Sequence, residues 1–257
     1  MPRATFAPSI VAALAAALLF GASTPLAKQL LADTSPMLLA GLLYLGSGVG
    51  LGLIRLLRDR GWRRAALSGA EWRWLVLAIA FGGVLGPLLL MLGLARTAAA
   101  PASLLLNLEA VFTALLAWIA FRENADRRII LGMALIVAGA AALAGGRAWQ
   151  ARGFGWGAPL IALACLCWAI DNNLTRKVSA SDALFLAGIK GLAAGLVNTG
   201  LALLLGERLA APADVAATMA VGLLGYGVSL VLFVVALRGL GAARTGAYFS
   251  TAPFLGA

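Results

Sequence analysis

The sequence predicts an all-α polytopic membrane protein, and the prediction rests on its composition and on the length of its apolar runs. Of the 257 residues, 62% are hydrophobic and only 12% are charged, and the mean hydropathy is +0.97. Soluble globular chains carry roughly 25% charged residues. Apolar runs of about 20 residues, which span ~30 Å of hydrocarbon as a helix, recur along the chain. Because the bilayer interior holds no water to satisfy the backbone, each run is expected to be helical.

Eight apolar runs, bounded by charged residues or by Gly and Pro, are predicted to span the membrane. They cover residues 8–30, 36–54, 74–94, 98–120, 129–144, 156–175, 183–205 and 218–237, and a ninth begins near Thr245. The loops are short, so one helical bundle without a soluble domain is expected. A signal peptide over Met1–Ser23 is the alternative for the first run, but the run continues to Leu31, which favours a membrane helix.

The basic charge of the chain indicates topology. The net charge is +10, with 17 Arg, 3 Lys and no His, and the cations cluster between the apolar runs, which argues against nucleic-acid binding. A cytoplasmic N-terminus places 14 cations inside and five outside, with Lys190 within a span, as the positive-inside rule requires. The excess of Arg, Ala, Gly and Leu is typical of a GC-rich bacterial genome, so a bacterial inner membrane is the expected location.

The chain contains an internal repeat. Three pairs of segments align at offsets of 143, 148 and 147: Leu94–Ala114 with Leu237–Ala257, Leu19–Lys28 with Cys167–Arg176, and Leu38–Gly41 with Phe185–Gly188. A repeat of five spans, an odd number, inserts its two copies in opposite orientations, which is typical of transporters. The alternative is that any two spans rich in Ala, Leu and Gly look alike. We expect repeats at 1–148 and 149–257, the second incomplete, with about nine of ten helices in this sequence.

One segment also resembles a known family. Within Ala102–Ala142, a Glu, a Trp, a loop Glu and two Gly follow the late-repeat pattern of the drug/metabolite transporter superfamily, specifically its EamA-like family; they are Glu109, Trp118, Glu123, Gly132 and Gly139. Ala236–Ala257 resembles the start of a second copy, with the family's proline at Pro253. The first copy departs from the pattern at Ala110 and Arg122. The resemblance implies ten helices in two inverted five-helix repeats around a central cavity.

Glu109 is the first candidate site residue. It lies eleven residues into the predicted span 98–120, or ~16 Å from its start, too deep for its side chain to reach an interface. A carboxylate in lipid costs several kcal/mol unless it is paired, wetted or protonated. Two interpretations remain open: a cavity group that carries a proton, and a structural contact to the backbone or a cation of a neighbouring helix.

A polar stripe on the span 156–175 supplies further candidates. Trp168, Asp171, Asn172 and Thr175 follow i, i+3, i+4, i+7 spacing, and their repeat partners are Phe20, Ser23, Thr24 and Ala27. Two such stripes would suit a cavity for a small amphiphilic solute. The alternative is that Asp171 and Asn172 mark a wet cytoplasmic helix end. Lys190, ~10 Å deep, either snorkels to the surface or pairs with Asp171 or Glu109.

The predicted function is secondary transport of a small metabolite, amino acid or drug-like solute across the membrane by alternating access, with export as the expected direction. The chain has no nucleotide-binding GxxxxGK[ST] motif, no His and no Gly-x-Ser-x-Gly elbow, so neither ATP-driven transport nor an enzyme, a cofactor or a metal site is expected. A lipid-linked substrate flippase and a non-transporting scaffold are the alternatives. The expected partners are a small-molecule substrate and the lipid bilayer, with the proton as a candidate coupling ion, a homodimer as a candidate assembly, and no nucleic acid.

The orientation can be tested by labelling. Loops 55–73 and 121–128 hold nine of the twenty cations and should face the cytoplasm. Single cysteines at Ser68 and Asn124, in a chain without Cys165 and Cys167, should therefore resist an impermeant maleimide in intact cells and react after permeabilisation. Reaction at both positions in intact cells would show that the orientation is reversed.

Overall fold

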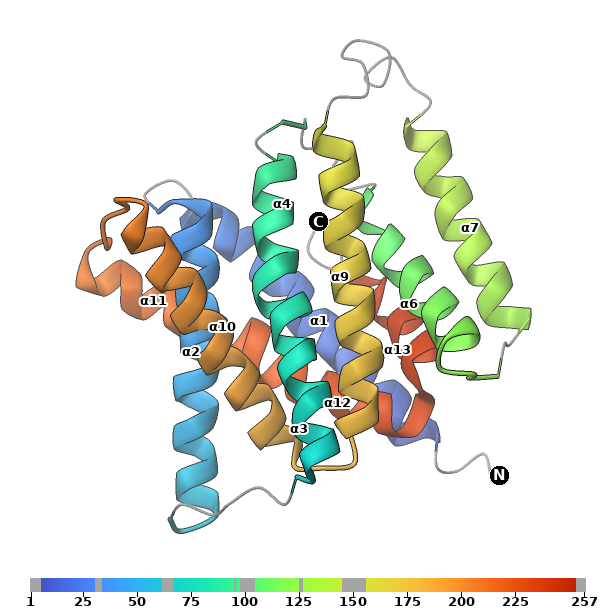
Figure 1. Cartoon of the computed structure of the whole chain (residues 1–257), viewed down its shortest axis with the longest axis horizontal. Coiled ribbons are helices and arrows are strands. Elements are labelled where there is room, and N and C mark those ends of the chain that lie inside the picture. The colour runs from blue at the N-terminus through green and yellow to red at the C-terminus, as the bar shows by residue number, and fades with distance from the viewer. Residues whose placement is uncertain are drawn as a thin grey trace.

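The computed structural model describes residues 6–30, 34–61, 67–94, 96–97, 105–124, 127–144 and 156–252, and their regular structure is helical (Figure 1). The helices are α1 (Phe6–Leu30), α2 (Pro36–Arg58), α3 (Gly69–Ala78), α4 (Gly86–Leu94), α6 (Leu108–Ile119), α7 (Arg127–Ala144), α9 (Gly157–Val178), α10 (Ala183–Leu204), α11 (Pro212–Gly222), α12 (Ser229–Leu240) and α13 (Ala242–Phe249). Within the described residues, six continuous helical stretches are long and apolar enough to cross a membrane. The all-α polytopic prediction is confirmed.

Local signals explain where several helices begin. Ser35 caps α2, where its side chain accepts a hydrogen bond from the backbone N–H of Leu38 at 3.3 Å and a proline follows at the first helical position. Ser68 and Glu71 form a capping box at the start of α3. Asp182 caps α10 through the N–H of Leu184. Each cap satisfies a backbone donor that the helix itself leaves free.

Two long helical stretches change locally from α to π geometry. Between α3 and α4 lies the π-helical segment η2 (Ile79–Leu85), and between α11 and α12 lies η3 (Leu223–Val228). They begin 144 positions apart, so they fall at corresponding places in the two predicted repeats. π-Helical segments are rare in proteins, and those that occur often lie at functional sites. The division at residue 148 itself remains a prediction.

The fourth predicted span differs from its expected form. Residues 98–104 lie outside the described residues, Asn107 is a turn, and α6 begins only at Leu108. Glu109 therefore lies in the first turn of a helix, and not in the middle of a continuous one as predicted. In the other half, α13 ends at Phe249 and Ser250 is a turn, 143 positions after Asn107. A polar residue, Asn107 or Ser250, lies at each of these two helix interruptions. Side chains of this kind can compete with the helix for backbone hydrogen bonds.

Helices α2 and α10 approach each other closely because glycines lie on their shared face. A Cβ atom added at Gly191 would come within 2.7 Å of the backbone nitrogen of Gly48, and one at Gly195 within 2.8 Å of the Leu45 side chain. Such small faces allow backbones to pack closely in membranes. The glycine run of α2 serves two neighbours, since Gly46 and Gly50 face α11 and η3, while Gly52 faces open space.

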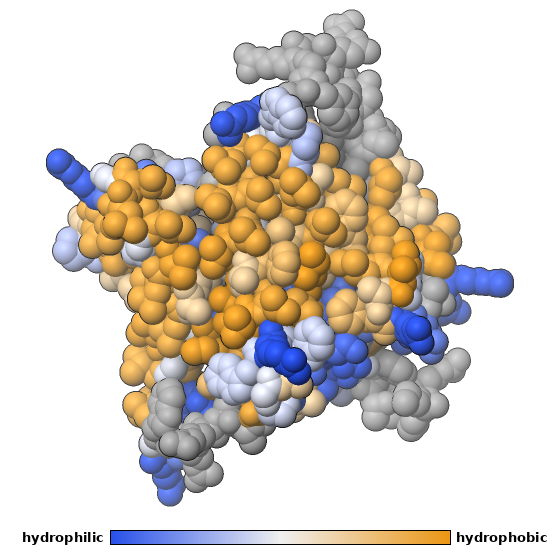
Figure 2. Space-filling model, viewed as in Figure 1, coloured by the Kyte–Doolittle hydropathy of each residue, from blue (hydrophilic) through white to orange (hydrophobic). Residues whose placement is uncertain are grey.

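The outside of the bundle is largely apolar. Leu131, Leu135 and Leu196 are each more than 60% exposed. Figure 2 shows apolar residues over most of one face, with hydrophilic residues gathered near the end where α3 begins and α9 ends. Exposed leucines of this kind suit contact with lipid tails, and the hydrophilic end suits an aqueous boundary. The structure therefore has the surface of a multi-pass membrane protein.

The α2–α10 contact predicts a contrast between two glycines of α10. Gly191→Ala should lower the melting temperature of the detergent-solubilised protein, because overpacking costs about 1–3 kcal/mol. Gly200→Ala should leave it unchanged or raise it slightly, because a Cβ at Gly200 meets nothing within 4 Å and alanine favours a helix by roughly 0.5–1 kcal/mol. Equal effects of the two substitutions on the melting temperature would contradict this assignment.

Candidate functional site

A polar cluster joins α9 to α6 inside the bundle. The side-chain amide of Asn172 donates to Glu109 Oε1 at 3.0 Å and to Thr113 Oγ1 at 3.2 Å. The amide of Asn173 donates to the backbone carbonyl of Thr113 at 3.0 Å. Asn173 and Thr113 are almost fully buried, while Glu109 is half-buried. Glu109 therefore does contact a neighbouring helix, as one of its two interpretations expects, but its partner there is the amide side chain of Asn172 and not a backbone group or a cation.

A buried ion pair lies beside this cluster. Lys190 of α10 pairs with Asp171 of α9 and also donates to Thr175 Oγ1 at 2.9 Å. The Thr175 hydroxyl lies 2.9 Å from Asp171 Oδ1, so the three groups form a closed set. Lys190 is 6% exposed and Asp171 is 9% exposed. Lys190 therefore pairs with Asp171 and does not snorkel, and neither Asp171 nor Asn172 marks a wet helix end.

The predicted stripe on α9 divides between two neighbouring surfaces. Asp171 and Trp168 both lie against η2, since a Cβ added at Gly82 would overlap the Asp171 carboxylate and the Trp168 indole donates to the Gly82 carbonyl at 3.0 Å. Asn172 points instead toward α6. Successive residues on a helix differ by about 100° in direction, which is enough to separate them.

The first-half candidates belong mainly to an aromatic group. Ser23 donates to the carbonyl of Phe20 on its own helix at 2.7 Å and lies against Gly225 of η3. The ring of Phe20 lies 5.3 Å from the rings of both Tyr226 and Phe249. Tyr44 of α2 extends the group, 5.5 Å from Tyr226. The side chain of Thr24 lies outside the described residues.

Sequence reasoning missed the tyrosines, because aromatic residues within apolar runs look like ordinary core. Tyr44 and Tyr226 carry hydroxyls, however, and a polar tip deep within a predicted span is the signal that could have identified them. Glycines near the centre of two predicted spans, Gly82 in 74–94 and Gly225 in 218–237, were a second signal, which pointed to close contacts between helices. A glycine is favoured where another chain approaches closely.

The thiol of Cys165 donates to backbone carbonyl groups just before α6. Its sulfur lies 3.5 Å from the carbonyl oxygen of Leu105 and 3.8 Å from that of Leu106, the two residues that precede the turn at Asn107. A carbonyl freed by a helix break must find a donor inside the protein at this depth. Within the part of the chain that the structure describes, no group of three or more His, Cys, Asp or Glu side chains could hold a metal ion.

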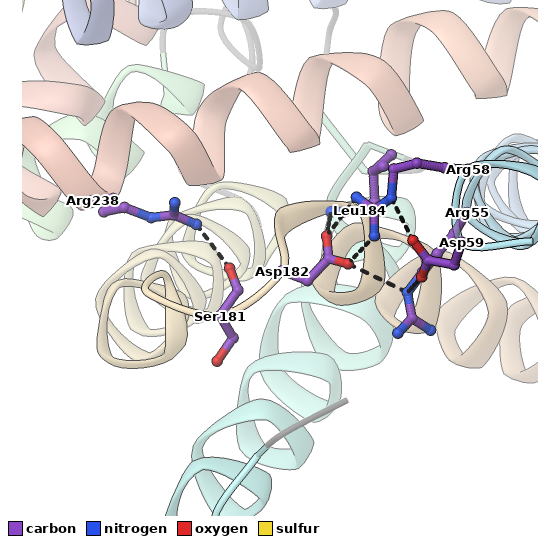
Figure 3. Close-up of polar contacts among 7 residues, drawn as sticks. All are labelled: Arg55, Arg58, Asp59, Ser181, Asp182, Leu184 and Arg238. Carbon is purple, nitrogen blue, oxygen red and sulfur yellow. Dashed lines mark hydrogen bonds and ion pairs between the residues drawn. The ribbon is translucent and has the colours of Figure 1, made fainter. Parts of the chain in front are cut away.

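Charged residues fasten one end of the bundle (Figure 3). Asp182, at the start of α10, accepts from Arg58 and from Arg55 Nε at 3.4 Å, both at the end of α2. Asp59 pairs with the same two arginines, at 3.5 Å from Arg55 and 2.7 Å from Arg58. From the other side, Arg238 of α12 donates to the carbonyls of Ser179 and Ser181 at 2.6 and 2.7 Å. The α9–α10 loop is therefore held by both α2 and α12.

Glu123 makes a second fastening at the same end. Its carboxylate accepts from the backbone N–H groups of Ala242 and Ala243 at 3.0 and 3.4 Å, which caps α13, and lies 3.9 Å from Arg176 Nε at the end of α9. A carboxylate at a helix N-terminus is stabilised by the helix dipole. Glu123 is therefore not a freely solvated loop residue.

The charge of Asp182 is stabilised where it lies. Partial burial raises the pKa of Asp182, but the hydrogen bond and the charge of Arg58 outweigh that effect, so the pKa lies below its ordinary value. A carboxylate with a lowered pKa contributes stability above its ordinary pKa, and this contribution is lost only as the pH falls through the lowered value. The network at this end should thus be intact at all physiological pH values.

An apolar groove of about 410 Å³ lies between α6 and α7, apart from these polar groups. Val111 and Leu115 of α6 face Met133 and Val137 of α7 across it. It has no charged lining residue that could select a solute. The polar cluster on α9, and not this groove, is the candidate site.

The fold and the buried polar cluster define a polytopic α-helical membrane protein with charged groups held inside its bundle. The model of the EamA-like transporter family matches residues 7–145 and 155–257, and the chain belongs to this family. A protein of Methanothermobacter thermautotrophicus described as an uncharacterized transporter is 29% identical over 262 residues, covering 96% of this chain and 76% of the relative. A protein of known crystal structure is 18% identical in sequence and superimposes with a TM-score of 0.77. The match covers 96% of this chain and 85% of the chain in that structure, which shows a shared fold. The family and the relative both indicate membrane transport.

The network of Figure 3 predicts a graded response at Asp182. Asp182→Asn keeps a good helix cap but loses the ion pairs, whereas Asp182→Ala also loses the cap, worth about 0.5–2 kcal/mol, and should melt at the lower temperature. The difference in melting temperature between the wild type and Asp182→Asn should stay constant from about pH 8 to pH 5 and shrink at lower pH.

Asp59→Asn is the matched control. Asp59 is the C-cap of α2, and both of its ion pairs are with arginines of the same helix, so they do not link α2 to α10. The substitution should lower the melting temperature less than Asp182→Asn. A larger effect at Asp59 would mean that Asp182 does not link α2 to α10 energetically.

Proposed function

We propose that this protein is a secondary transporter that exports a small amphiphilic metabolite, such as an amino acid or a drug-like solute, by alternating access. The observation that carries the proposal is the position of Glu109. It lies two residues after the turn at Asn107, and in the other half α13 ends before a turn at Ser250, the position that corresponds to Asn107. Paired interruptions of membrane helices at corresponding positions are typical of substrate and ion sites in transporters.

The charges of the site favour the binding of a proton or of a cationic group of the substrate at Glu109. Lys190 neutralises Asp171, while the contact of Glu109 in the described residues is to the neutral amide of Asn172. When all three ionise, this set carries one net negative charge. An uncompensated charge within a membrane costs several kcal/mol, so a proton or a substrate cation that binds Glu109 relieves that cost. Exchange of one for the other would couple proton entry to solute export.

The aromatic group is the proposed apolar side of the same site. Phe20, Tyr44, Tyr226 and Phe249 come from α1, α2, η3 and α13, so they draw on both halves of the chain. All four are half-buried. Aromatic side chains with a few well-placed polar groups are the usual lining of small-molecule sites. A solute with an apolar body and a charged or polar end fits such a lining.

The membrane topology of the proposal follows the sequence. Two inverted repeats, a cytoplasmic N-terminus and a bacterial inner membrane are the arrangement we propose, with a homodimer as a candidate assembly. The cation-rich ends of α2, α9 and α12 meet at one end of the bundle, which agrees with a single cytoplasmic face. Solute flux in proteoliposomes separates a transporter from a flippase or a scaffold.

Glu109→Gln tests the role of the carboxylate. Glutamine keeps an acceptor for Asn172 but cannot hold a charge, so export should fall at least about tenfold and lose its pH dependence, since a charged hydrogen bond contributes about 1.5–3 kcal/mol. The assay is resistance of an overexpressing strain to toxic amino-acid and metabolite analogues, followed by proteoliposome flux of those to which the wild type confers resistance.

Glu207→Gln is the matched control, because Glu207 is exposed, and it should transport as the wild type does. Glu123 is unsuitable as a control because it caps α13. Full transport and unchanged pH dependence in Glu109→Gln would remove Glu109 from the site.

A further inference from the structure

Two side chains of the second half hold the backbone of the first π-helical segment. The indole of Trp168 on α9 donates to the carbonyl oxygen of Gly82 at 3.0 Å, and the amide of Asn198 on α10 donates to that of Gly83 at 2.8 Å. Asn198 is 2% exposed, so its amide is committed to this contact. Two adjacent carbonyls of η2 are thus bound by donors from two different helices.

The geometry of η2 explains why external donors are useful there. At its end, the N–H of Gly86 bonds to the carbonyl of Phe81, five residues back, instead of four. Pro87 has no backbone N–H, so the carbonyl of Gly82 lacks a partner in π geometry and the carbonyl of Gly83 lacks one in α geometry. In a membrane another part of the protein must then supply a donor. A return of η2 to α geometry would shift this pattern and change which carbonyls need donors.

The same segment touches the buried ion pair. Gly82 packs so closely on Asp171 that any side chain at this position would overlap the carboxylate. A Cβ at Gly83 would come within 2.8 Å of Ala194, on the α10 face between Lys190 and Asn198. The position of η2 is therefore set by the residues that surround the Asp171–Lys190 pair.

The second π-helical segment is held differently. Tyr226 of η3 contacts the rings of Phe20 and Tyr44, and Gly225 lies against Ser23. These partners come from α1 and α2, the first two helices of the chain, as α9 and α10 are the first two of the predicted second repeat. Each π-helical segment is thus held by the first two helices of the opposite half, η2 by hydrogen bonds and η3 by ring contacts.

We propose that Trp168 and Asn198 are positioning residues that hold η2 in its π-helical form against the Asp171–Lys190 pair, and that release of these two bonds is a step of the transport cycle. The second part of this proposal rests on the proposed function. The two residues act on the backbone of α3–η2–α4, so their loss should slow the conformational step more than it weakens solute binding. Movement of this helix stretch would then be coupled to occupancy of the site.

Hydrogen–deuterium exchange of the full chain in nanodiscs tests the positioning role without any substrate. Asn198→Leu and Trp168→Phe each remove a donor while keeping most of the volume. Both should speed exchange of the amides in residues 79–90 at least about fivefold, as expected for loss of one hydrogen bond that restrains local opening.

Thr199→Val and Trp118→Phe are the matched controls. The Thr199 hydroxyl and the Trp118 indole N–H are buried without a hydrogen-bond partner in the described part of the chain, so their removal should leave exchange in residues 79–90 unchanged. Unchanged exchange in Asn198→Leu and Trp168→Phe, or equal acceleration in the controls, would overturn the positioning role.

Proteoliposome flux tests the second part separately, with an analogue to which the wild type confers resistance. Asn198→Leu should lower the maximal rate at least about threefold and change KM less than twofold, because Asn198 contacts η2 and not the site. A raised KM with an unchanged maximal rate would overturn the transport step. Absence of flux in the wild type would refute the proposed function and this step with it, while the exchange comparison would still decide the positioning role.

Discussion

Inside a bilayer, every backbone polar group and every charge must find its partner within the protein, and the structure of this chain depends on that constraint. A continuous α-helix meets it alone, which is why the chain is a series of apolar helices. At two places where the helices depart from regular geometry, side chains from other helices donate to the backbone carbonyls. Cys165 does so at the break before α6, and Trp168 and Asn198 do so at η2.

These departures from regular helix and the candidate site occupy the same region. Glu109 follows a break, Asp171 packs on a π-helical segment, and Asn172 joins α9 to α6. The concentration of irregular backbone around buried charges is expected, because backbone that is not helical is tolerated in a membrane only where protein surrounds it or where it lines a water-filled path. Buried ionisable groups are costly for the same reason and are usually functional.

The charged end of the bundle and its interior differ in how their ion pairs contribute to stability. At the end shown in Figure 3, Arg55, Arg58 and Asp182 lie near an aqueous boundary, where a single exposed ion pair contributes little. Here several pairs share the same carboxylates and also cap helices, so the fastening is collective. The Asp171–Lys190 pair, in contrast, is buried, and loss of either partner would leave an uncompensated charge. The first network can open at modest cost, whereas the second is expected to persist or to exchange a partner.

Much of the candidate site could be found from the sequence, because a Glu, Asp or Lys within an apolar run is conspicuous. The partners were less accessible. Lys190 had two possible acids, and only the rotation and crossing of α9 and α10 bring Asp171 within reach of it. Asn198 and Tyr44 were missed because their role depends on helices that are distant in the sequence.

The sequence by itself determined the all-α class, the approximate positions of the long apolar helices that the structure describes, and the presence of ionisable residues within apolar runs. These are local properties, set by the transfer of each side chain between water and lipid. Only the tertiary structure decided that the fourth span is broken at Asn107, that η2 and η3 are π-helical, and which side chains meet. Those features depend on competition between helix hydrogen bonds and contacts from other helices, and no single segment contains the information for that competition.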